Sequence, residues 1–254
     1  MVWGDIAAVS YLNTVPFIYG IASADNLRAR LLLSPPSGCA RTLAEGKADI
    51  ALVPVAAIPS IPDIDIVTPW CIGASGSVRT VVVLSNEPWE RVRRVWLDTH
   101  SMTSVQLVRV LARERWGVDP EWMPLDDYTL LGRPAAGDAF LIIGDKVFGW
   151  EERFAYKYDL ADEWRAMTGL PFVFAAWVAR RGTPAPAVAE LDEALAYGVR
   201  HIDEAIRHYG HADKPYAHDY LTRNIDFAFD GPKRRALSLF WGKGQKIPPA
   251  ENPG

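Results

Sequence analysis

RTVVVLS at Arg79–Ser85 and FVFAAWVA at Phe172–Ala179 are the most strand-like stretches of this 254-residue chain. Both are rich in β-branched and aromatic residues, which favour extended backbone. The segment between them carries strand and helix signals of its own. We therefore interpret the two stretches as crossover strands, which leave a first lobe near residue 84 and return to it near residue 172. Two crossings of this kind predict a hinged clamp that closes on a ligand.

The residues on the first-lobe side alternate between short apolar strands and helical segments. Strands are predicted at Ile6–Val9, Leu31–Leu33 and Asp49–Val53, and helices at Asn13–Tyr19, Pro36–Gly46 and Val188–Tyr209. Alternation of this kind predicts a parallel sheet covered by helices. Residues 1–84 and 172–254 are thus assigned to lobe one, with Pro248–Gly254 as a loose tail.

The intervening residues 85–171 are assigned to lobe two. They contain predicted strands at Val95–Leu97 and Ala139–Ile143 and a predicted helix at Ser104–Trp116. The expected fold class is α/β, with two lobes joined by two crossover strands and a ligand cleft between them. Ligands of open α/β sheets lie beyond the carboxyl ends of the strands. The segments after Val9 and Val53 are therefore candidate walls of that cleft.

The charge balance argues against a nucleic acid as the partner of this chain. Lysine and arginine total 27 against 31 aspartates and glutamates, so the formal net charge is -4. A nucleic-acid-binding surface needs a basic patch or stripe, and none is apparent. An anionic ligand would therefore have to be held by local groups rather than by the overall charge.

The sequence predicts a cytoplasmic protein without a membrane partner. No apolar run approaches the roughly 18 residues of a membrane-spanning helix. The amino-terminal residues do not resemble a secretion signal, because Asp5 comes early and Asn13, Thr14 and Pro16 interrupt the apolar stretch. Two cysteines are too few for a disulfide scaffold, so reduced thiols are expected.

No metal ion or cofactor is expected. Four of the five histidines lie close together in the sequence, but their spacing does not place pairs at i and i+4 on one helix face. These are His201, His208, His211 and His218. The usual glycine-rich and nucleophile motifs for nucleotide binding and serine hydrolysis are also missing.

Polar residues follow two of the predicted strands at the point where a helix should begin. Ser10, Asn13 and Thr14 lie in AAVSYLNTVPFIYG (7–20), and Ser101, Thr103 and Ser104 lie in LDTHSMTS (97–104). Free N–H groups at a helix start, together with such side chains, bind carboxylates without a positive charge. The alternative is that these side chains only cap the helices.

Two further turns are candidate walls of the cleft. GASGSVRT (73–80) lets the backbone approach a ligand closely and offers hydroxyl groups from Ser75, Ser77 and Thr80, although an ordinary flexible turn is the alternative. Gly144 and Asp145 end another predicted strand. Asp145 is equally suited to contact a ligand or to cap the helix that follows.

Six segments in this order resemble the chorismate dehydratase family of the futalosine route to menaquinone. They are SYLNTVPFIYG, PSGCARTLAEGKADIALVP, GSVRTVVVLS, LDTHSMTSVQLVRVL, AFLIIGD and DLADEWRAMTGLPFVFAAWVARR, which together span most of residues 6–181. That family resembles periplasmic binding proteins of the second structural class, but it is cytoplasmic and catalytic. The resemblance implies a periplasmic-binding-protein type II-like fold and, as partner, the small molecule chorismate.

The resemblance also implies a reaction and roles for residues. Chorismate would lose water to give 3-[(1-carboxyvinyl)oxy]benzoate, with its own enolpyruvyl carboxylate as the base. Asn13 matches the family's essential asparagine, Thr80 stands where some members have a serine, and Ser77 replaces a proline common in that turn. The hydroxyl loop Ser101, Thr103 and Ser104 matches the family's carboxylate-binding loop. Ser10, Gly144 and Asp145 lie in matching motifs, and their side chains would shape the wall.

Two other functions are compatible with the same clamp. One is a non-catalytic protein that binds a small anion. The other is the sister enzyme of the same pathway, which makes the dihydroxynaphthoate skeleton and relies on a different amino-terminal motif and a histidine.

Overall fold

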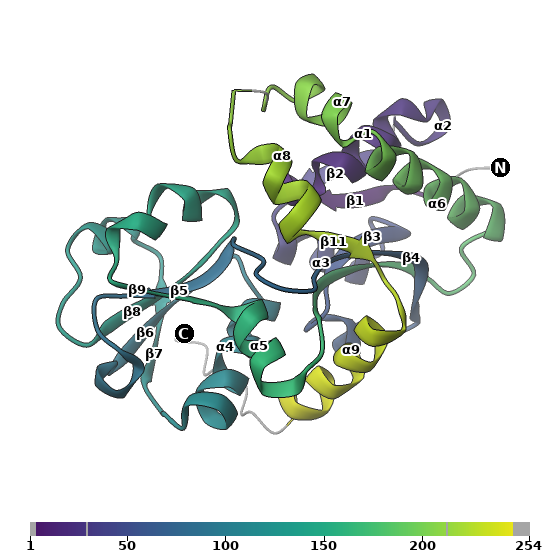
Figure 1. The fold of residues 1–254 in the computed structure, drawn as a ribbon. Coiled ribbons are helices and arrows are strands. Elements are labelled where there is room, and N and C mark those ends of the chain that lie inside the picture. The colour runs from purple at the N-terminus through teal and green to yellow at the C-terminus, as the bar shows by residue number, and fades with distance from the viewer. Residues whose placement is uncertain (1–3, 29, 212, 246–254) are drawn as a thin grey trace.

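Two β-sheets form the centres of two lobes in the computed structural model, which describes residues 4–28, 30–211 and 213–245 (Figure 1). The sheet of lobe one has the strand order β11-β4-β10-β3-β1-β2, and that of lobe two has the order β7-β6-β8-β5-β9. Pro248–Gly254, predicted as a loose tail, lies outside the described residues. The α/β fold with two lobes is as predicted.

The sheet of lobe one is parallel on one side and antiparallel on the other. Its strands are β1 (Ile6–Val9), β2 (Leu31–Ser34), β3 (Ile50–Pro54), β4 (Ile64–Ala74), β10 (Phe172–Arg180) and β11 (Asp226–Ala228). β1 pairs in parallel with β2 and β3, so the predicted parallel sheet is confirmed for these strands. β10 is antiparallel to both β3 and β4.

Helices cover the faces of the lobe-one sheet (Figure 1). They are η1 (Leu12–Thr14), α1 (Val15–Ser23), α2 (Asp25–Arg28), α3 (Pro36–Ala44), η2 (Ile58–Ser60), α6 (Ala185–Arg200), α7 (Ile202–His208), α8 (Ala217–Asp219), η8 (Tyr220–Asn224) and α9 (Gly231–Gly244). α1 and α6 pack backbone to backbone, since a Cβ atom at Gly198 would lie 1.8 Å from the Pro16 carbonyl oxygen. The predicted helix Val188–Tyr209 is present as α6 and α7.

Lobe two is a mixed sheet with its own helices. Its elements are β5 (Val81–Ser85), η3 (Trp89–Arg91), β6 (Arg94–Asp98), α4 (Thr103–Leu111), η4 (Ala112–Trp116), β7 (Glu121–Leu125), η5 (Tyr128–Gly132), β8 (Asp138–Ile143), η6 (Gly144–Gly149), η7 (Glu151–Arg153), β9 (Tyr156–Asp159) and α5 (Leu160–Thr168). β6 is parallel to β7 and β8, whereas β5 is antiparallel to β8 and β9. The carboxyl ends of β6 and β8 therefore meet at one edge.

The prediction that the two strand-like stretches themselves cross between lobes is wrong. β5 lies between β8 and β9 in lobe two, and β10 lies between β3 and β4 in lobe one. Apolar strands of this kind satisfy their backbone groups best with a partner on each side. The chain passes between the sheets in the short segments 75–80 and 169–171 instead. We accordingly propose a lobe boundary at residue 80 rather than 84.

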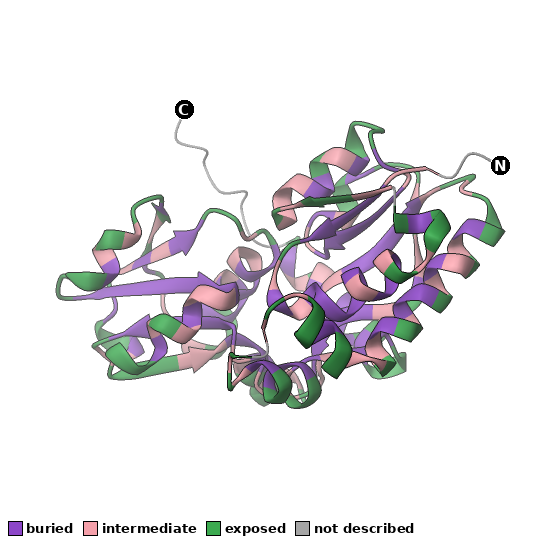
Figure 2. Cartoon of the chain, turned by 90° about the horizontal axis from the view of Figure 1, so that it is seen from above, coloured by how far each residue is buried: buried purple, intermediate pink, exposed green. Residues whose placement is uncertain are grey.

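The strands are the most deeply buried part of both lobes, and the helices turn exposed faces outward (Figure 2). β3, β5 and β8 are buried at every residue. Trp164 and Trp177 are fully buried, and the Trp177 ring packs edge-on against Phe17 with centroids 5.8 Å apart. These tryptophans belong to the core, as their residue type predicts.

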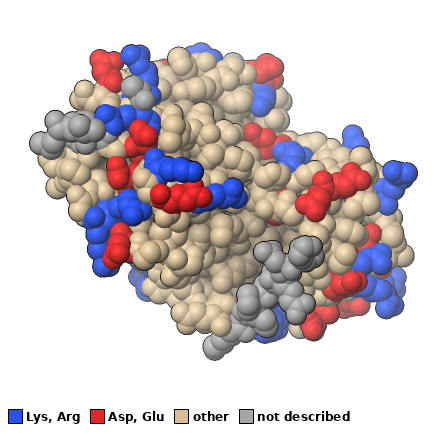
Figure 3. Space-filling view, turned by 180° about the vertical axis from the view of Figure 1, so that it is seen from behind, with Lys and Arg blue, Asp and Glu red and all other residues tan. Residues whose placement is uncertain are grey.

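Acidic and basic side chains are interspersed on the face shown in Figure 3. None of the described helices combines the length and the apolar character needed to cross a bilayer. In residues 4–28, 30–211 and 213–245, no three His, Cys, Asp or Glu side chains are arranged to share a metal ion.

Candidate active site

A cavity of about 580 Å³, its open mouth included, lies between the lobes. Lobe one contributes Val9, Tyr11, Asn13, Thr14, Pro36, Leu52, Pro54, Ile72, Phe174 and Ala175, the passage between lobes contributes Val78 and Thr80, and lobe two contributes Val81, Ser101, Met102, Thr103, Ser104, Ile143 and Gly144. No lysine or arginine is among these lining residues, so an anion here would meet neutral donors.

Seven of the ten predicted site residues line this cavity. These are Asn13, Thr14, Thr80, Ser101, Thr103, Ser104 and Gly144. Ser10 is exposed and, like Ser77 and Asp145, is not part of the lining. The cavity therefore collects residues from four segments that are far apart in the sequence.

The helix start in lobe one is not capped by its own polar side chains. The Thr14 hydroxyl bonds to the carbonyl oxygens of Val9 and Tyr11, the latter at 2.7 Å. Neither η1 nor α1 has a side-chain cap, so the capping alternative fails for this segment. The Asn13 Oδ1 atom is buried and has no hydrogen-bond partner among the described residues. A buried carbonyl oxygen without a partner is costly, which marks Asn13 as a group that awaits a ligand.

Asp145 reaches from lobe two to this same helix start. Both of its carboxylate oxygens lie 3.3 Å from the Leu12 backbone nitrogen, which donates to them. Asp145 does not cap its own helix η6. Burial raises the pKa of Asp145, although the Leu12 hydrogen bond opposes that rise. The protein thus places its own carboxylate where we expected a ligand anion.

Gly144 lets lobe two approach lobe one closely. Its backbone is left-handed, with φ of +71°, and a Cβ atom there would lie 3.5 Å from the Tyr11 ring. A side chain would be strained in this backbone conformation, although its Cβ atom would lie at an ordinary contact distance from the Tyr11 ring. The glycine therefore brings the end of β8 against the lobe-one segment that carries Asn13.

The helix start in lobe two, at α4, is arranged differently. The Ser101 hydroxyl accepts a hydrogen bond from the Ser104 backbone nitrogen at 3.1 Å and so acts as a cap. Thr103 donates to the Phe174 carbonyl oxygen at 3.0 Å and accepts from the Ala56 nitrogen at 3.2 Å, which fastens α4 to lobe one. The Ser104 hydroxyl makes no hydrogen bond to a described residue and lines the cavity. Ser104 is therefore the free hydroxyl at this start.

The passage between the lobes supplies Thr80 but not Ser77. The Ser77 hydroxyl donates to the Asp159 carboxylate at 2.7 Å, and the Arg79 nitrogen donates to the same group at 2.6 Å. Ser77 thereby shapes the turn and does not face the cavity. The Thr80 hydroxyl lies 2.6 Å from the phenol oxygen of Tyr220, at the start of η8.

Sequence reasoning missed Tyr220, Tyr11 and a charged cluster beside the cavity. The cluster centres on Asp98, which is fully buried and contacts Lys146 at 2.6 Å and His100 at 3.3 Å. Burial, with the nearby carboxylates of Asp98 and Asp145, raises the pKa of Tyr11 to about 12. Asp98 ends a strand in LDTHSMTS, and a carboxylate at a strand end is the signal that could have identified it.

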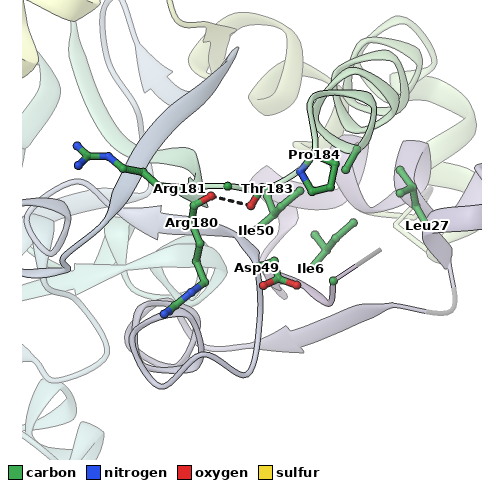
Figure 4. Close-up of a pocket in the computed structure, with 11 residues that line it drawn as sticks. Ile6, Leu27, Asp49, Ile50, Arg180, Arg181, Thr183 and Pro184 are labelled. Atoms are coloured by element: carbon green, nitrogen blue, oxygen red, sulfur yellow. Dashed lines mark hydrogen bonds between the residues drawn. The ribbon is translucent and has the colours of Figure 1, made fainter. Parts of the chain in front are cut away.

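A second pocket lies at the other end of the lobe-one strands, where β1 and β3 begin (Figure 4). It is lined by the beginnings of β1 and β3, at Ile6 and Ile50, and by the turn after β10. Arg180 there donates to the Leu43 carbonyl oxygen at 2.9 Å, and Arg181 pairs with Asp65. Ligands of α/β sheets lie at the carboxyl ends of the strands, which favours the cavity between the lobes as the functional site.

The fold places the chain in the class of periplasmic-binding-protein-like structures. A protein of Archaeoglobus fulgidus superposes with a TM-score of 0.76 at 16% identity, over 95% of this chain and 96% of that one. A Candida albicans protein described as having the generic periplasmic binding protein fold gives a TM-score of 0.65 at 12% identity, over 95% and 91% of the two chains. At these identities the likeness is one of fold.

Sequence comparison defines the family within that class. A family profile described as "Menaquinone biosynthesis" matches residues 5–246, and the chain belongs to this menaquinone biosynthesis family. It is 27% identical to the chorismate dehydratase of Thermus thermophilus over 235 residues, which are 83% of this chain and 85% of that one. It is also 30% identical to the 1,4-dihydroxy-6-naphthoate synthase of Streptomyces coelicolor over 161 residues, 61% of this chain and 57% of that enzyme.

Proposed function

We propose that this protein is a chorismate dehydratase, a carbon-oxygen lyase of the futalosine pathway. The observation that carries the proposal is the unpartnered Asn13 amide oxygen, buried in a cavity whose other wall offers the Ser104 hydroxyl and the start of α4. The similarity to chorismate dehydratase over 85% of that enzyme supports it. Two free, buried cysteines fit the cytoplasmic location that we propose for it.

The start of α4 would hold a carboxylate of chorismate. Helix-start N–H groups and hydroxyls stabilise an anion without a cation, and the lining residues offer no cation. The ring would then lie toward lobe one, beside Asn13 and Thr80. Because no lysine or arginine is among the lining residues, the substrate's second carboxylate would meet no cation there that lowers its basicity.

That second carboxylate, on the enolpyruvyl group, would act as the base. It takes the proton from the ring carbon that bears the ether, the electron pair forms a ring double bond, and the hydroxyl on the neighbouring carbon leaves. Proton and hydroxide together make water, and the ring becomes aromatic. The protein's part is to fix this geometry and to stabilise charge at the departing oxygen.

Incubation of the pure protein with chorismate tests the proposal. We expect 3-[(1-carboxyvinyl)oxy]benzoate and water without any added cofactor, with the product identified by chromatography and mass spectrometry. A correctly folded sample that leaves chorismate unchanged would rule the proposal out. Binding of chorismate without turnover, seen as a raised Tm, would instead indicate a non-catalytic binding protein.

The second candidate is the synthesis of the dihydroxynaphthoate skeleton. Two observations favour it: the 30% identity to 1,4-dihydroxy-6-naphthoate synthase, and the Asp98–His100 pair next to Ser101, since that enzyme relies on a histidine. The chain aligns with only 57% of that synthase, and SYLNT stands in place of its amino-terminal motif. Chorismate dehydration is therefore the better supported of the two.

A further inference from the structure

The chain leaves lobe one through a turn that is strained at a residue other than glycine. Arg79 has a backbone φ of +65°, in the left-handed region that favours glycine. The Thr80 nitrogen donates to the Val78 carbonyl oxygen at 2.8 Å, which closes a three-residue γ-turn around Arg79. A γ-turn with positive φ is rare and strained. Both residues that flank Arg79 line the cavity between the lobes.

One carboxylate of lobe two holds this turn in place. With one oxygen, Asp159 at the end of β9 accepts from the Ser77 hydroxyl at 2.7 Å and from the Arg79 nitrogen at 2.6 Å. Its other oxygen accepts from the Val78 nitrogen at 3.2 Å and also caps α5. A strained backbone persists only where its surroundings hold it in that conformation. The carboxylate therefore does for this turn what a glycine would do by its conformational freedom.

The Arg79 side chain is fastened to the same lobe. Its guanidinium lies 3.1 Å from the buried Glu151 carboxylate and 4.9 Å from the centre of the Phe148 ring. After the turn, the Thr80 carbonyl oxygen accepts from the Gly144 nitrogen at 2.9 Å. The backbone and the side chain of Arg79 are thus both bound to lobe two, so the turn belongs mechanically to that lobe.

We propose that Asp159 is a positioning residue that holds the γ-turn at Arg79, and with it the cavity wall on either side of that residue, in place for the reaction. The inference rests on the proposed dehydration of chorismate. Asp159 does not itself line the cavity, so it acts through the turn. Without the carboxylate, Arg79 would relax to negative φ and the peptide groups on either side of it would rotate. The wall beside the substrate ring would then change shape, while the α4 wall stays in place.

Asp159→Asn removes one hydrogen bond of the turn and keeps the others. The amide oxygen still accepts from Val78 and caps α5, because asparagine caps helices as well as aspartate does. The amide nitrogen can donate to the Ser77 hydroxyl but cannot accept from the Arg79 N–H group. We expect kcat for chorismate to fall about tenfold or more, with KM changed less than about threefold. Asp230→Asn, at the cap of α9 outside the cavity, is the matched control and should retain kcat within about twofold.

Arg79→Gly gives a readout that a simple loss of stability would not change. Glycine adopts positive φ without strain, so the turn no longer depends on the carboxylate. In the Arg79→Gly background, Asp159→Asn should therefore lower kcat less than about threefold. An equal fold loss in both backgrounds, or an unchanged kcat in the single variant Asp159→Asn, would overturn the proposal.

Deuterium exchange tests the hold on the turn without substrate. In the wild type, the Arg79 amide should exchange more slowly than the Gly76 amide, which has no hydrogen-bond partner among the described residues. The difference should vanish in Asp159→Asn or, if that variant does not fold, in Asp159→Ser, whose shorter side chain still caps α5. An Arg79 amide that exchanges as fast as Gly76 in the wild type would overturn the proposal. Slow exchange in a protein that leaves chorismate unchanged would support the hold on the turn and refute the dehydration.

Discussion

The two helix starts that face each other across the cavity look alike in sequence and differ in structure. Both follow a strand and both carry hydroxyl residues. In lobe one, the Leu12 backbone nitrogen already donates a hydrogen bond to a carboxylate of the protein, that of Asp145 from lobe two. In lobe two, Ser101 caps the helix and leaves the Ser104 hydroxyl free.

The difference assigns separate tasks to the two walls. A helix start that holds a protein carboxylate repels a second anion, so the substrate carboxylate should bind at α4. On the lobe-one wall, Asn13 lines the cavity and has a buried side-chain oxygen without a hydrogen-bond partner among the described residues. We therefore expect variants in lobe one to alter turnover and variants at α4 to alter binding, and five substitutions test this comparison of the two walls.

Asn13→Ala should have the largest effect. The amide oxygen has no protein partner, so its loss removes little from the folded state but removes the contact with the reacting group. We expect kcat to fall about 100- to 1,000-fold or more, with Tm lowered by only a few degrees. Initial rates and thermal unfolding measure the two quantities. Retention of kcat within about threefold would contradict the role of Asn13.

Ser104→Ala and Ser101→Ala should separate binding from stability within one wall. Ser104→Ala should raise KM about tenfold with kcat nearly unchanged, because a free hydroxyl that contacts the substrate is lost. Ser101→Ala removes a cap and should lower the free energy of unfolding by about 1 kcal/mol. Steady-state kinetics and denaturant unfolding on both variants give the comparison. If the two variants showed the same changes in KM and in the free energy of unfolding, the separate roles of Ser101 as a cap and Ser104 as a ligand contact would be wrong.

Asp145→Asn should change the pH dependence of stability. Because burial raises the pKa of Asp145 above the value of 3.8 for a free carboxyl, the folded state holds the proton more tightly than the unfolded state does. Stability from this group is therefore lost as pH rises from about 4 through the folded pKa. An asparagine oxygen still accepts from Leu12 and does not titrate. We expect the free energy of unfolding of the variant to rise relative to that of the wild type as pH increases across that window. Parallel curves of stability against pH for the two proteins would contradict this.

His100→Ala should have the smallest effect. The imidazole pairs with Asp98 and does not line the cavity. If the substrate supplies the base, kcat should change less than about threefold and the pH-rate profile should keep its shape. A loss of about 100-fold would indicate a histidine base and favour the second candidate function.

Local patterns in the sequence were sufficient to predict most of the fold. β1, β3, β5, β8 and β10 are short apolar runs, and α3, α4 and α6 show helical periodicity, so these elements follow from side-chain spacing. The strands β4, β7, β9 and β11 and the helix α9 were not predicted. The start of α9 at Asp230 is a clear cap, since that carboxylate accepts from the Lys233 nitrogen. The crossing points were misplaced because apolar character indicates where a strand is buried but not which sheet it joins.

The site was predictable only in part, for a physical reason. Asn13 and Ser104 lie beside strand ends, and this position can be read from the sequence. The contacts that define their roles join distant parts of the chain: Thr80 with Tyr220, Leu12 with Asp145, and Thr103 with Phe174. Such pairs depend on how lobes and segments pack, which no local pattern of one chain contains.

The hydrogen bond from the Leu12 backbone nitrogen to Asp145 can form only while the two lobes are close together. Separation of the lobes would withdraw the carboxylate and leave the Leu12 amide hydrogen open to solvent. The rate of deuterium exchange at this amide, one residue away from Asn13, would then report how often the two lobes separate. A ligand that holds the lobes together would slow this single amide more than its neighbours in α1, whose hydrogen bonds lie within the helix.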